Sequence, residues 1–82
     1  MKINEIKNIL DYARECGRLL TITLVSGQVS HINFSKKTKK FTATDDVILD
    51  VDGHLVMKYD TDGSVDYIDS DSIIRIFSKE CV

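Results

Sequence analysis

The sequence contains no proline, only four glycines and only two cysteines, Cys16 and Cys81. The lack of proline and the scarcity of glycine argue against a linker or a low-complexity tail. The two cysteines lack metal-like spacing to each other and to His31 or His54, so neither a disulfide framework nor a metal site is indicated. No apolar run approaches the roughly 18 residues of a membrane span, and the first residues lack the apolar core of a signal peptide. These absences predict a cytoplasmic protein with reduced thiols and no membrane contact.

The length of the chain limits it to one domain. Eighty-two residues, 43% of them hydrophobic and 29% charged, can build a single core but not a second one. A chain of this size buries only about 60–65% of its unfolded surface, so a contact between copies would supplement a thin core. We therefore expect one domain over residues 1–82 that assembles as a homo-oligomer.

The charge is nearly balanced in sum but not along the chain. Eleven Lys and Arg against 13 Asp and Glu give a formal net charge of −2. This balance excludes a uniformly basic nucleic-acid coat and, at this hydrophobicity, a disordered chain. Residues 1–44 carry eight basic and three acidic side chains, whereas residues 45–82 carry three basic and ten acidic ones. A basic half is thus followed by an acidic half.

Apolar residues at three- and four-residue spacing predict an amphipathic helix over about residues 4–16. The apolar stripe consists of Ile3, Ile6, Ile9, Leu10 and Ala13. Asn4 is expected to cap the start of this helix, and Arg14 lies near the negative end of its dipole. Gly17 supplies the left-handed residue at which many helices end.

After Gly17 the apolar period changes to two, which predicts an antiparallel β-meander over about residues 18–78. Ser26-Gly27 marks the first turn, and the apolar run 73–77 marks the last strand. Val29 is out of phase with Ile32 in the second strand. We therefore expect a β-bulge near Ser30 and His31 that bends this strand, as small closed barrels require.

Asp52-Gly53 and Asp62-Gly63 predict two-residue hairpin turns. With turns of that length, one sheet face gathers Val47, Leu49, Val51, Val56, Val65 and Tyr67, and the other gathers Ile48, Leu55, Met57, Tyr59 and Ile68. Because both faces are apolar, one should line a barrel interior and the other should meet the helix or a second subunit. The expected fold is α+β and mainly β: an N-terminal helix followed by a strongly bent, five- or six-stranded antiparallel barrel.

This order of elements resembles the Sm-like family, which includes the bacterial RNA chaperone Hfq. The segment Leu19-Leu20-Thr21-Ile22-Thr23-Leu24-Val25-Ser26-Gly27 is similar to the opening strand and turn of Sm-like proteins, and residues 66–76 resemble the second Sm signature. The resemblance implies an Sm-like small barrel. An Arg-Gly or Lys-His pair helps to build the nucleotide pocket of that family, and Asp69 and Ser70 stand at those positions here. Since an aspartate repels phosphate, we do not expect the family's uridine pocket in this chain.

The chain also resembles a second Sm-like group, the Rho-binding antiterminators of the Rof type. The first strand and turn of that group are similar to Leu20-Thr21-Ile22-Thr23-Leu24-Val25-Ser26-Gly27. Their acidic surface occupies a basic RNA-binding site on a partner protein. This resemblance implies mimicry of a nucleic acid rather than its capture.

Four lysines flanked by two aromatic residues form the most basic stretch of the chain. The lysines are Lys36, Lys37, Lys39 and Lys40, and the flanking residues are Phe34 and Phe41. Positive charges beside aromatic rings are how a protein builds a patch for RNA or nucleotide phosphates. A run of like charge also keeps an exposed loop solvated, so both interpretations remain open.

The acidic half of the chain offers an alternative interaction surface. Its candidate residues for binding a basic protein partner are Asp60, Asp62, Asp66, Asp69 and Asp71. The alternating aspartates around Asp60 do not fit a calcium loop, because a valine stands where that loop requires glycine. No phosphate loop, catalytic triad or pair of catalytic carboxylates is present, so we expect neither an enzyme nor a cofactor.

Three kinds of regulator remain compatible with the sequence. The first binds RNA or nucleotides through the lysine-rich stretch. The second is a protein-binding regulator, of the Rho-antiterminator or phage-inhibitor type, that uses the acidic surface. The third is a phage-type sponge that binds a small signalling nucleotide between subunits, which the size of the chain allows but no particular residue supports.

Overall fold

The computed structural model describes residues 1–35, 44–50, 52–59 and 62–80. These ranges contain one α-helix, α1 (Ile3–Cys16), and one 3₁₀ helix, η1 (Ser70–Ser72). They also contain six strands: β1 (Leu19–Leu24), β2 (Val29–Asn33), β3 (Thr44–Leu49), β4 (His54–Tyr59), β5 (Val65–Asp69) and β6 (Ile73–Lys79). The expected class, α+β with mainly β structure, is confirmed.

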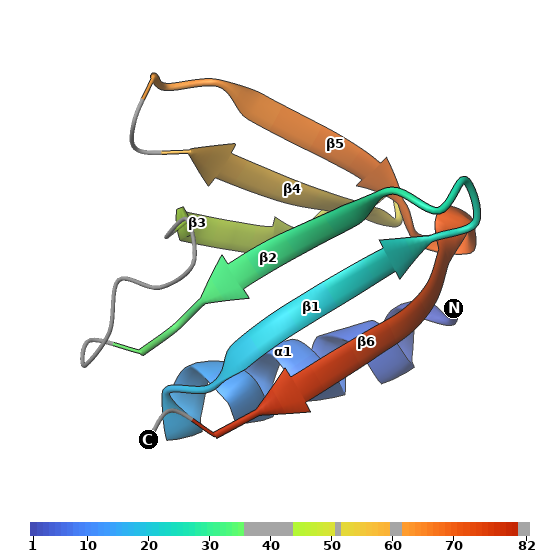
Figure 1. Ribbon diagram of the computed structural model, residues 1–82. Helices are drawn as coiled ribbons and strands as arrows, with labels where there is room; N and C mark the ends of the chain where they lie inside the picture. Colours follow the sequence, from blue (N-terminus) through green and yellow to red (C-terminus); the bar gives the residue numbers. More distant parts are fainter. Residues whose placement is uncertain (36–43, 51, 60–61, 81–82) are drawn as a thin grey trace.

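The strands form two three-stranded antiparallel sheets. One has the order β2-β1-β6 and the other has the order β3-β4-β5. Neighbours in sequence pair as hairpins, and the chain returns through η1 so that β6 pairs with β1. In Figure 1 the sheet β2-β1-β6 lies in front, β4 and β5 lie above it, and α1 passes behind β1 and β6.

One hydrophobic core joins α1 to both sheets. The helix buries the stripe Ile6, Leu10 and Ala13, and the strands contribute Leu20, Ile22, Ile32, Val47, Leu55, Met57, Ile68 and Ile73. Burying an aliphatic side chain of this size stabilises a fold by about 1.5–3 kcal/mol. The helical stripe predicted from the sequence is therefore the element that holds the two sheets in one unit.

The two ends of α1 agree with the sequence prediction only in part. Gly17 ends the helix at φ +66°, and its N–H donates to the carbonyl of Ala13. The prediction for Asn4 is wrong, because the helix already begins at Ile3 and Lys2 is its N-cap without a side-chain cap bond. Asn4 lies inside the first turn, where it cannot act as the N-cap.

The β-bulge predicted near Ser30 and His31 is not found. Pairing of β1 with β2 runs without a register shift from Leu19 opposite Asn33 to Thr23 opposite Val29. Ser30 and Ile32 point inward and are buried, whereas Val29 points outward. The prediction failed because it assigned the apolar Val29, rather than the small Ser30, to the core. The register shift lies instead between β1 and β6, after Thr23.

The turn between β3 and β4 is one residue longer than predicted. The Asp50 N–H donates to the His54 carbonyl at 2.9 Å, and Gly53 adopts φ +82°. The hydrogen bond between Asp50 and His54 therefore encloses a loop of three residues, a length at which hairpins commonly have a left-handed glycine.

A single added residue exchanges the two faces of a strand relative to its neighbour. The buried face accordingly combines Val47 with Leu55, Met57 and Ile68, and Leu49 packs partly against it. The opposite face carries Ile48, Val56 and Tyr67 in one row across the sheet. The predicted grouping of β3 with β4 and β5 is thus wrong, whereas the grouping of Val56 with Tyr67 is confirmed. Val51 and the side chain of Tyr59 lie outside what the structure describes.

Among the described residues, the core covers one face of β3-β4-β5. Ile48 and Tyr67 on the other face are 58% and 67% exposed. Of the two partners expected for the second apolar face, the helix or a second subunit, the helix packs on the face that carries Val47 and Met57, and contact of the other face with a second subunit stays a prediction.

Exchanging Val47 and, separately, Ile48 for Thr tests the corrected register. Val47→Thr places a hydroxyl in the core, and we expect it to lower the free energy of unfolding by about 1–2 kcal/mol. Ile48→Thr keeps a β-branched residue on an exposed position and should change it by less than about 0.5 kcal/mol. Urea unfolding of both variants measures the difference, and equal losses would contradict the register.

Candidate functional site

The lysine-rich stretch is described only at its flank. Lys36, Lys37, Lys39, Lys40 and Phe41 lie outside the described residues.

Phe34, the other flanking aromatic residue, is half-buried and packs against the core. The guanidinium of Arg14 lies 5.1 Å from the centre of its ring. Arg14 also donates to the Val47 carbonyl of β3 at 2.5 Å. Phe34 therefore has a packing role at this end of the molecule.

The strand that precedes the lysine-rich stretch in the sequence ends where the sheet β2-β1-β6 carries Arg18 and Lys79. Asn33, the last residue of β2, pairs with Leu19, and Leu19 pairs on its other side with Lys79 of β6. Arg18 precedes β1 at the same end and binds Ser78. Lys36, the first lysine of the stretch, is three residues after Asn33 in the sequence.

The five predicted acidic residues do not form one surface. Asp60 lies outside the described residues. Asp62 precedes β5 and Asp69 ends it, so these two lie at opposite ends of the strand. Asp66 is half-buried and pairs with the core residue Met57. Only Asp69 and Asp71 remain together, at η1.

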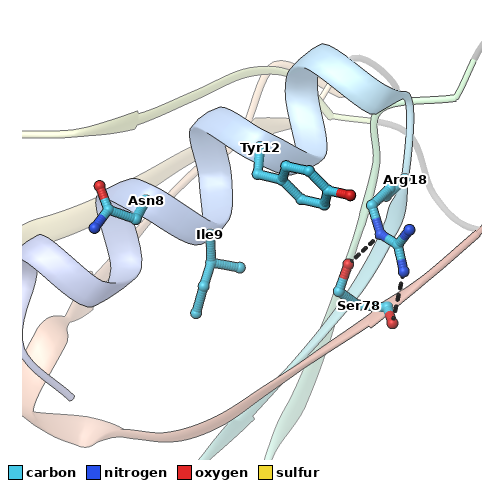
Figure 2. Close-up of a pocket in the computed structure, with 5 residues that line it drawn as sticks. All are labelled: Asn8, Ile9, Tyr12, Arg18 and Ser78. Atoms are coloured by element: carbon cyan, nitrogen blue, oxygen red, sulfur yellow. Dashed lines mark hydrogen bonds between the residues drawn. The ribbon is translucent and has the colours of Figure 1, made fainter.

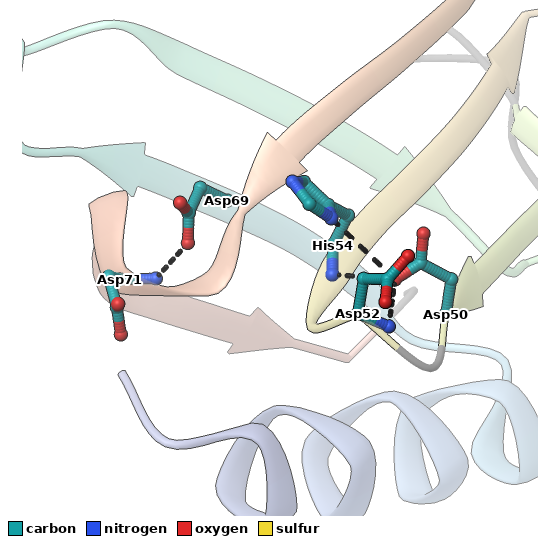
Figure 3. A network of polar contacts seen from close by, with 5 residues as sticks. All are labelled: Asp50, Asp52, His54, Asp69 and Asp71. Atoms are coloured by element: carbon teal, nitrogen blue, oxygen red, sulfur yellow. Dashed lines mark hydrogen bonds and ion pairs between the residues drawn. The ribbon is translucent and has the colours of Figure 1, made fainter.

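The structure brings two further aspartates to η1. The Ser70 N–H donates to the Gly53 carbonyl at 3.0 Å, which ties the β3–β4 turn to η1. Asp50 and Asp52 of that turn thereby lie at the same end of the molecule as Asp69 and Asp71, as Figure 3 shows. We call these four residues the acidic end. The sequence signals for the acidic end are the dipeptides Asp52-Gly53 and Asp69-Ser70. That these two segments lie together depends on a contact between parts of the chain that are distant in sequence.

Two of the four aspartates have a structural task. One Asp50 oxygen accepts hydrogen bonds from the backbone N–H groups of Asp52 and His54 at 3.0 and 2.9 Å, and lies 3.7 Å from His54 Nδ1. Asp69 accepts the Asp71 N–H at 2.9 Å and so caps η1. Asp50 and Asp69 therefore stabilise turns, while the charges of Asp52 and Asp71 are exposed.

An open groove of about 620 Å³ runs along the acidic end. It is lined by Met1, Lys2, Ile3, Asn4, Asp52, Asp69, Ser70 and Asp71. Within the described ranges no three His, Cys, Asp or Glu side chains are arranged to hold a metal ion. The groove thus presents carboxylates beside the first residues of α1.

A smaller groove of about 370 Å³ lies between α1 and β6 (Figure 2). Its lining residues are Asn8, Ile9, Tyr12, Arg18 and Ser78. Arg18 donates from Nε to Ser78 Oγ at 2.6 Å and lies 3.7 Å from a Glu80 carboxylate oxygen. Its guanidinium is also 5.8 Å from the centre of the Tyr12 ring. Through these contacts Arg18, the cation among the described residues of the groove, holds β6 against the helix.

Comparisons of the chain with protein-family models, with curated proteins and with solved structures gave no match. Among the described helices, none combines the length and the apolar character that crossing a membrane requires.

The pKa of Asp62 lies below its ordinary value of 3.8, because its carboxylate accepts hydrogen bonds from the Ser64 hydroxyl and then from the Ser64 backbone N–H. A lowered pKa means that these bonds stabilise the fold above the ordinary value and that this stabilisation is lost as the pH falls through the folded-state pKa. Ser64→Ala should raise the pKa of Asp62 toward 3.8. NMR measurement of the carboxyl chemical shifts against pH gives the pKa of Asp62, with Asp71 as the internal control. If the pKa of Asp62 does not change in the variant, the Ser64 hydroxyl is not the cause of its low value.

Proposed function

We propose that the protein is a small, non-enzymatic regulator that binds RNA or nucleotide phosphates through its lysine-rich stretch. The proposal is supported by the position of that stretch in the sequence. Its first lysine stands three residues after the end of β2, the sheet end at which Arg18 and Lys79 lie. Cations gathered at one end of a net acidic protein orient it toward a polyanion.

The proposal includes an Sm-like barrel as the scaffold. Three features support it: the two sheets share one core, β6 returns to β1 after a 3₁₀ helix, and α1 packs on that core.

Self-association is also part of the proposal. Within the described strands, β5 and β6 each lie at an edge of their sheet. Exposed apolar side chains accompany both edges, Tyr67 on β5 and Ile74 on β6. Pairing of one copy's edge with another copy's edge would cover these residues and satisfy the free backbone groups.

Removing charge from the lysine-rich stretch tests the phosphate contact. Lys36→Gln with Lys37→Gln should weaken binding to single-stranded RNA and lower the slope of log affinity against log salt by about 1.4, since each phosphate contact contributes about 0.7. Fluorescence anisotropy at several salt concentrations measures both. The matched change of Lys2 and Lys7 on α1 also lowers the formal net charge from −2 to −4, and an equal effect from it would contradict a specific contact.

The acidic end favours a second candidate function, the binding of a basic protein surface. Its four carboxylates come from two turns held together by the Ser70–Gly53 hydrogen bond. Because this hydrogen bond fixes the two turns relative to each other, the four carboxylates lose less conformational entropy on binding than four independent side chains would. Lys2 and the Met1 ammonium group, which donates to the Ser70 and Ile73 carbonyls, add two positive charges beside this groove.

Asp52→Asn with Asp71→Asn tests the second candidate without removing a turn-stabilising hydrogen bond. We expect binding of a labelled oligolysine peptide to weaken about three- to tenfold, as for the loss of two exposed ion pairs. The control changes Asp11 and Glu15 of α1, which removes the same charge elsewhere. Anisotropy titrations that show equal weakening in both variants would reduce the effect to net charge and contradict a binding site.

A further inference from the structure

The outer face of the sheet β2-β1-β6 combines exposed rings with cations. Phe77 of β6 and His31 of β2 each pair with Thr21 of β1, so the three residues form one row across the sheet. Phe77 is 46% exposed, and His31 is exposed as well. Two flat rings therefore flank a threonine on an open surface, and nothing is drawn in front of these strands in Figure 1.

The next row adds an arginine to the same face. Arg75 and Val29 both pair with Thr23. The guanidinium of Arg75 lies 5.5 Å from the centre of the Phe77 ring. In the part of the chain that the structure describes, Arg75 forms no ion pair, so its charge, which lies over the Phe77 ring, is available to an anionic ligand that contacts this ring.

Carboxylates are missing from this face among the described residues. The residues that strand alternation and pairing place on it are Leu19, Thr21, Thr23, Val29, His31, Asn33, Arg75, Phe77 and Lys79, of which Leu19 and Asn33 are buried. None of them is Asp or Glu, although the chain as a whole has 13 acidic residues. The face is therefore electropositive on a protein whose net charge is negative, and this difference selects for an anionic ligand with flat apolar parts.

We propose that the outer face of β2-β1-β6 is a stacking platform for single-stranded nucleic acid. Bases would stack on Phe77 and His31, and phosphates would contact Arg75 and Lys79. Stacking on an aromatic ring suits any base, because every base has a π face, and an arginine beside the ring strengthens the contact. This inference deepens the proposed function and rests on it for the class of ligand, a nucleic acid. It does not depend on the lysine-rich stretch, because none of these residues belongs to that stretch.

The size of the face agrees with this ligand. Strands lie about 4.8 Å apart, so about 10 Å separates β2 from β6. That distance spans about two or three nucleotides of one strand. A base pair presents its bases edge-on and stacked on each other, so a duplex cannot place a base flat on either ring.

The test compares Phe77→Ala with a matched change on the other sheet. Tyr67 is likewise an exposed aromatic residue on an outer sheet face, but among the described residues no guanidinium lies over its ring. Binding of a labelled oligouridylate of about ten nucleotides is followed by fluorescence anisotropy. We expect Phe77→Ala to weaken binding about tenfold, within the range for the loss of one stacked base. Tyr67→Ala should leave it unchanged, and Phe77→Trp should retain the affinity.

An abasic oligonucleotide of the same length separates stacking from charge. It keeps the phosphates and lacks the bases, so Phe77→Ala should have no effect on its binding. If Phe77→Ala weakens the normal and the abasic strand equally, or if a duplex binds as well as the single strand, the proposal is overturned. An oligoglutamate peptide that competes as well as the oligonucleotide would assign the face to an acidic protein segment and overturn it too. Circular dichroism melting of each variant confirms that the comparison is made on folded protein.

The lysine variants keep this inference distinct from the proposed function. If Lys36→Gln with Lys37→Gln weakens binding and Phe77→Ala does not, the platform is refuted and the lysine contact stands. If Phe77→Ala weakens binding to the normal strand only and the lysine variant does not, the platform stands and the lysine contact is refuted. If the unaltered protein binds no single strand, both fail.

Discussion

Burial of the stripe Ile6, Leu10 and Ala13 of α1 between two small sheets is the interaction on which the rest of the structure depends. Neither three-stranded sheet has a second apolar layer of its own, and a sheet of this size needs such a layer to be stable. Because the helix faces the inner side of both sheets, exposed side chains such as Tyr67 and Phe77 remain on the outer sides among the described residues. These outer sides are the surfaces on which we propose that a ligand or another copy binds.

The folded chain separates its charges in space more sharply than the sequence halves suggest. Asp50, Asp52, Asp69 and Asp71 gather at the end where η1 meets the β3–β4 turn. The outer face of β2-β1-β6 instead carries Arg75 and Lys79, and none of the described residues that strand pairing places on it is acidic. A net charge of −2 thus describes neither surface, and an acidic and a basic partner could each find a complementary region on one small domain.

Local patterns predicted the elements well, because helix period, strand alternation and the glycine at the end of α1 depend on near neighbours only. Gly17 and the stripe of α1 are examples. The faces of β3 were exchanged because one residue more in the turn at Gly53 reverses the parity of the whole strand. Val29 was placed inside because its hydropathy outweighed the small buried Ser30.

The candidate surfaces were harder to predict, because they depend on contacts between distant segments. Asp50 and Asp52 join η1 only through the Ser70–Gly53 hydrogen bond. Phe77 stands in an apolar run that is typical of a strand buried on both sides, and only its pairing with Thr21 shows that its ring faces outward. The lysine-rich stretch could be found from the sequence alone, since its charges are consecutive.

The claim that the outer face of β2-β1-β6 is where this protein meets its ligand is tested most directly by NMR. Backbone amide signals of the ¹⁵N-labelled protein are followed while a short single-stranded oligonucleotide is added. The account predicts that the signals of Thr21, His31, Arg75 and Phe77 shift together and saturate, while that of Tyr67 stays in place. Shifts confined to β3-β4-β5 or to the acidic end would contradict it.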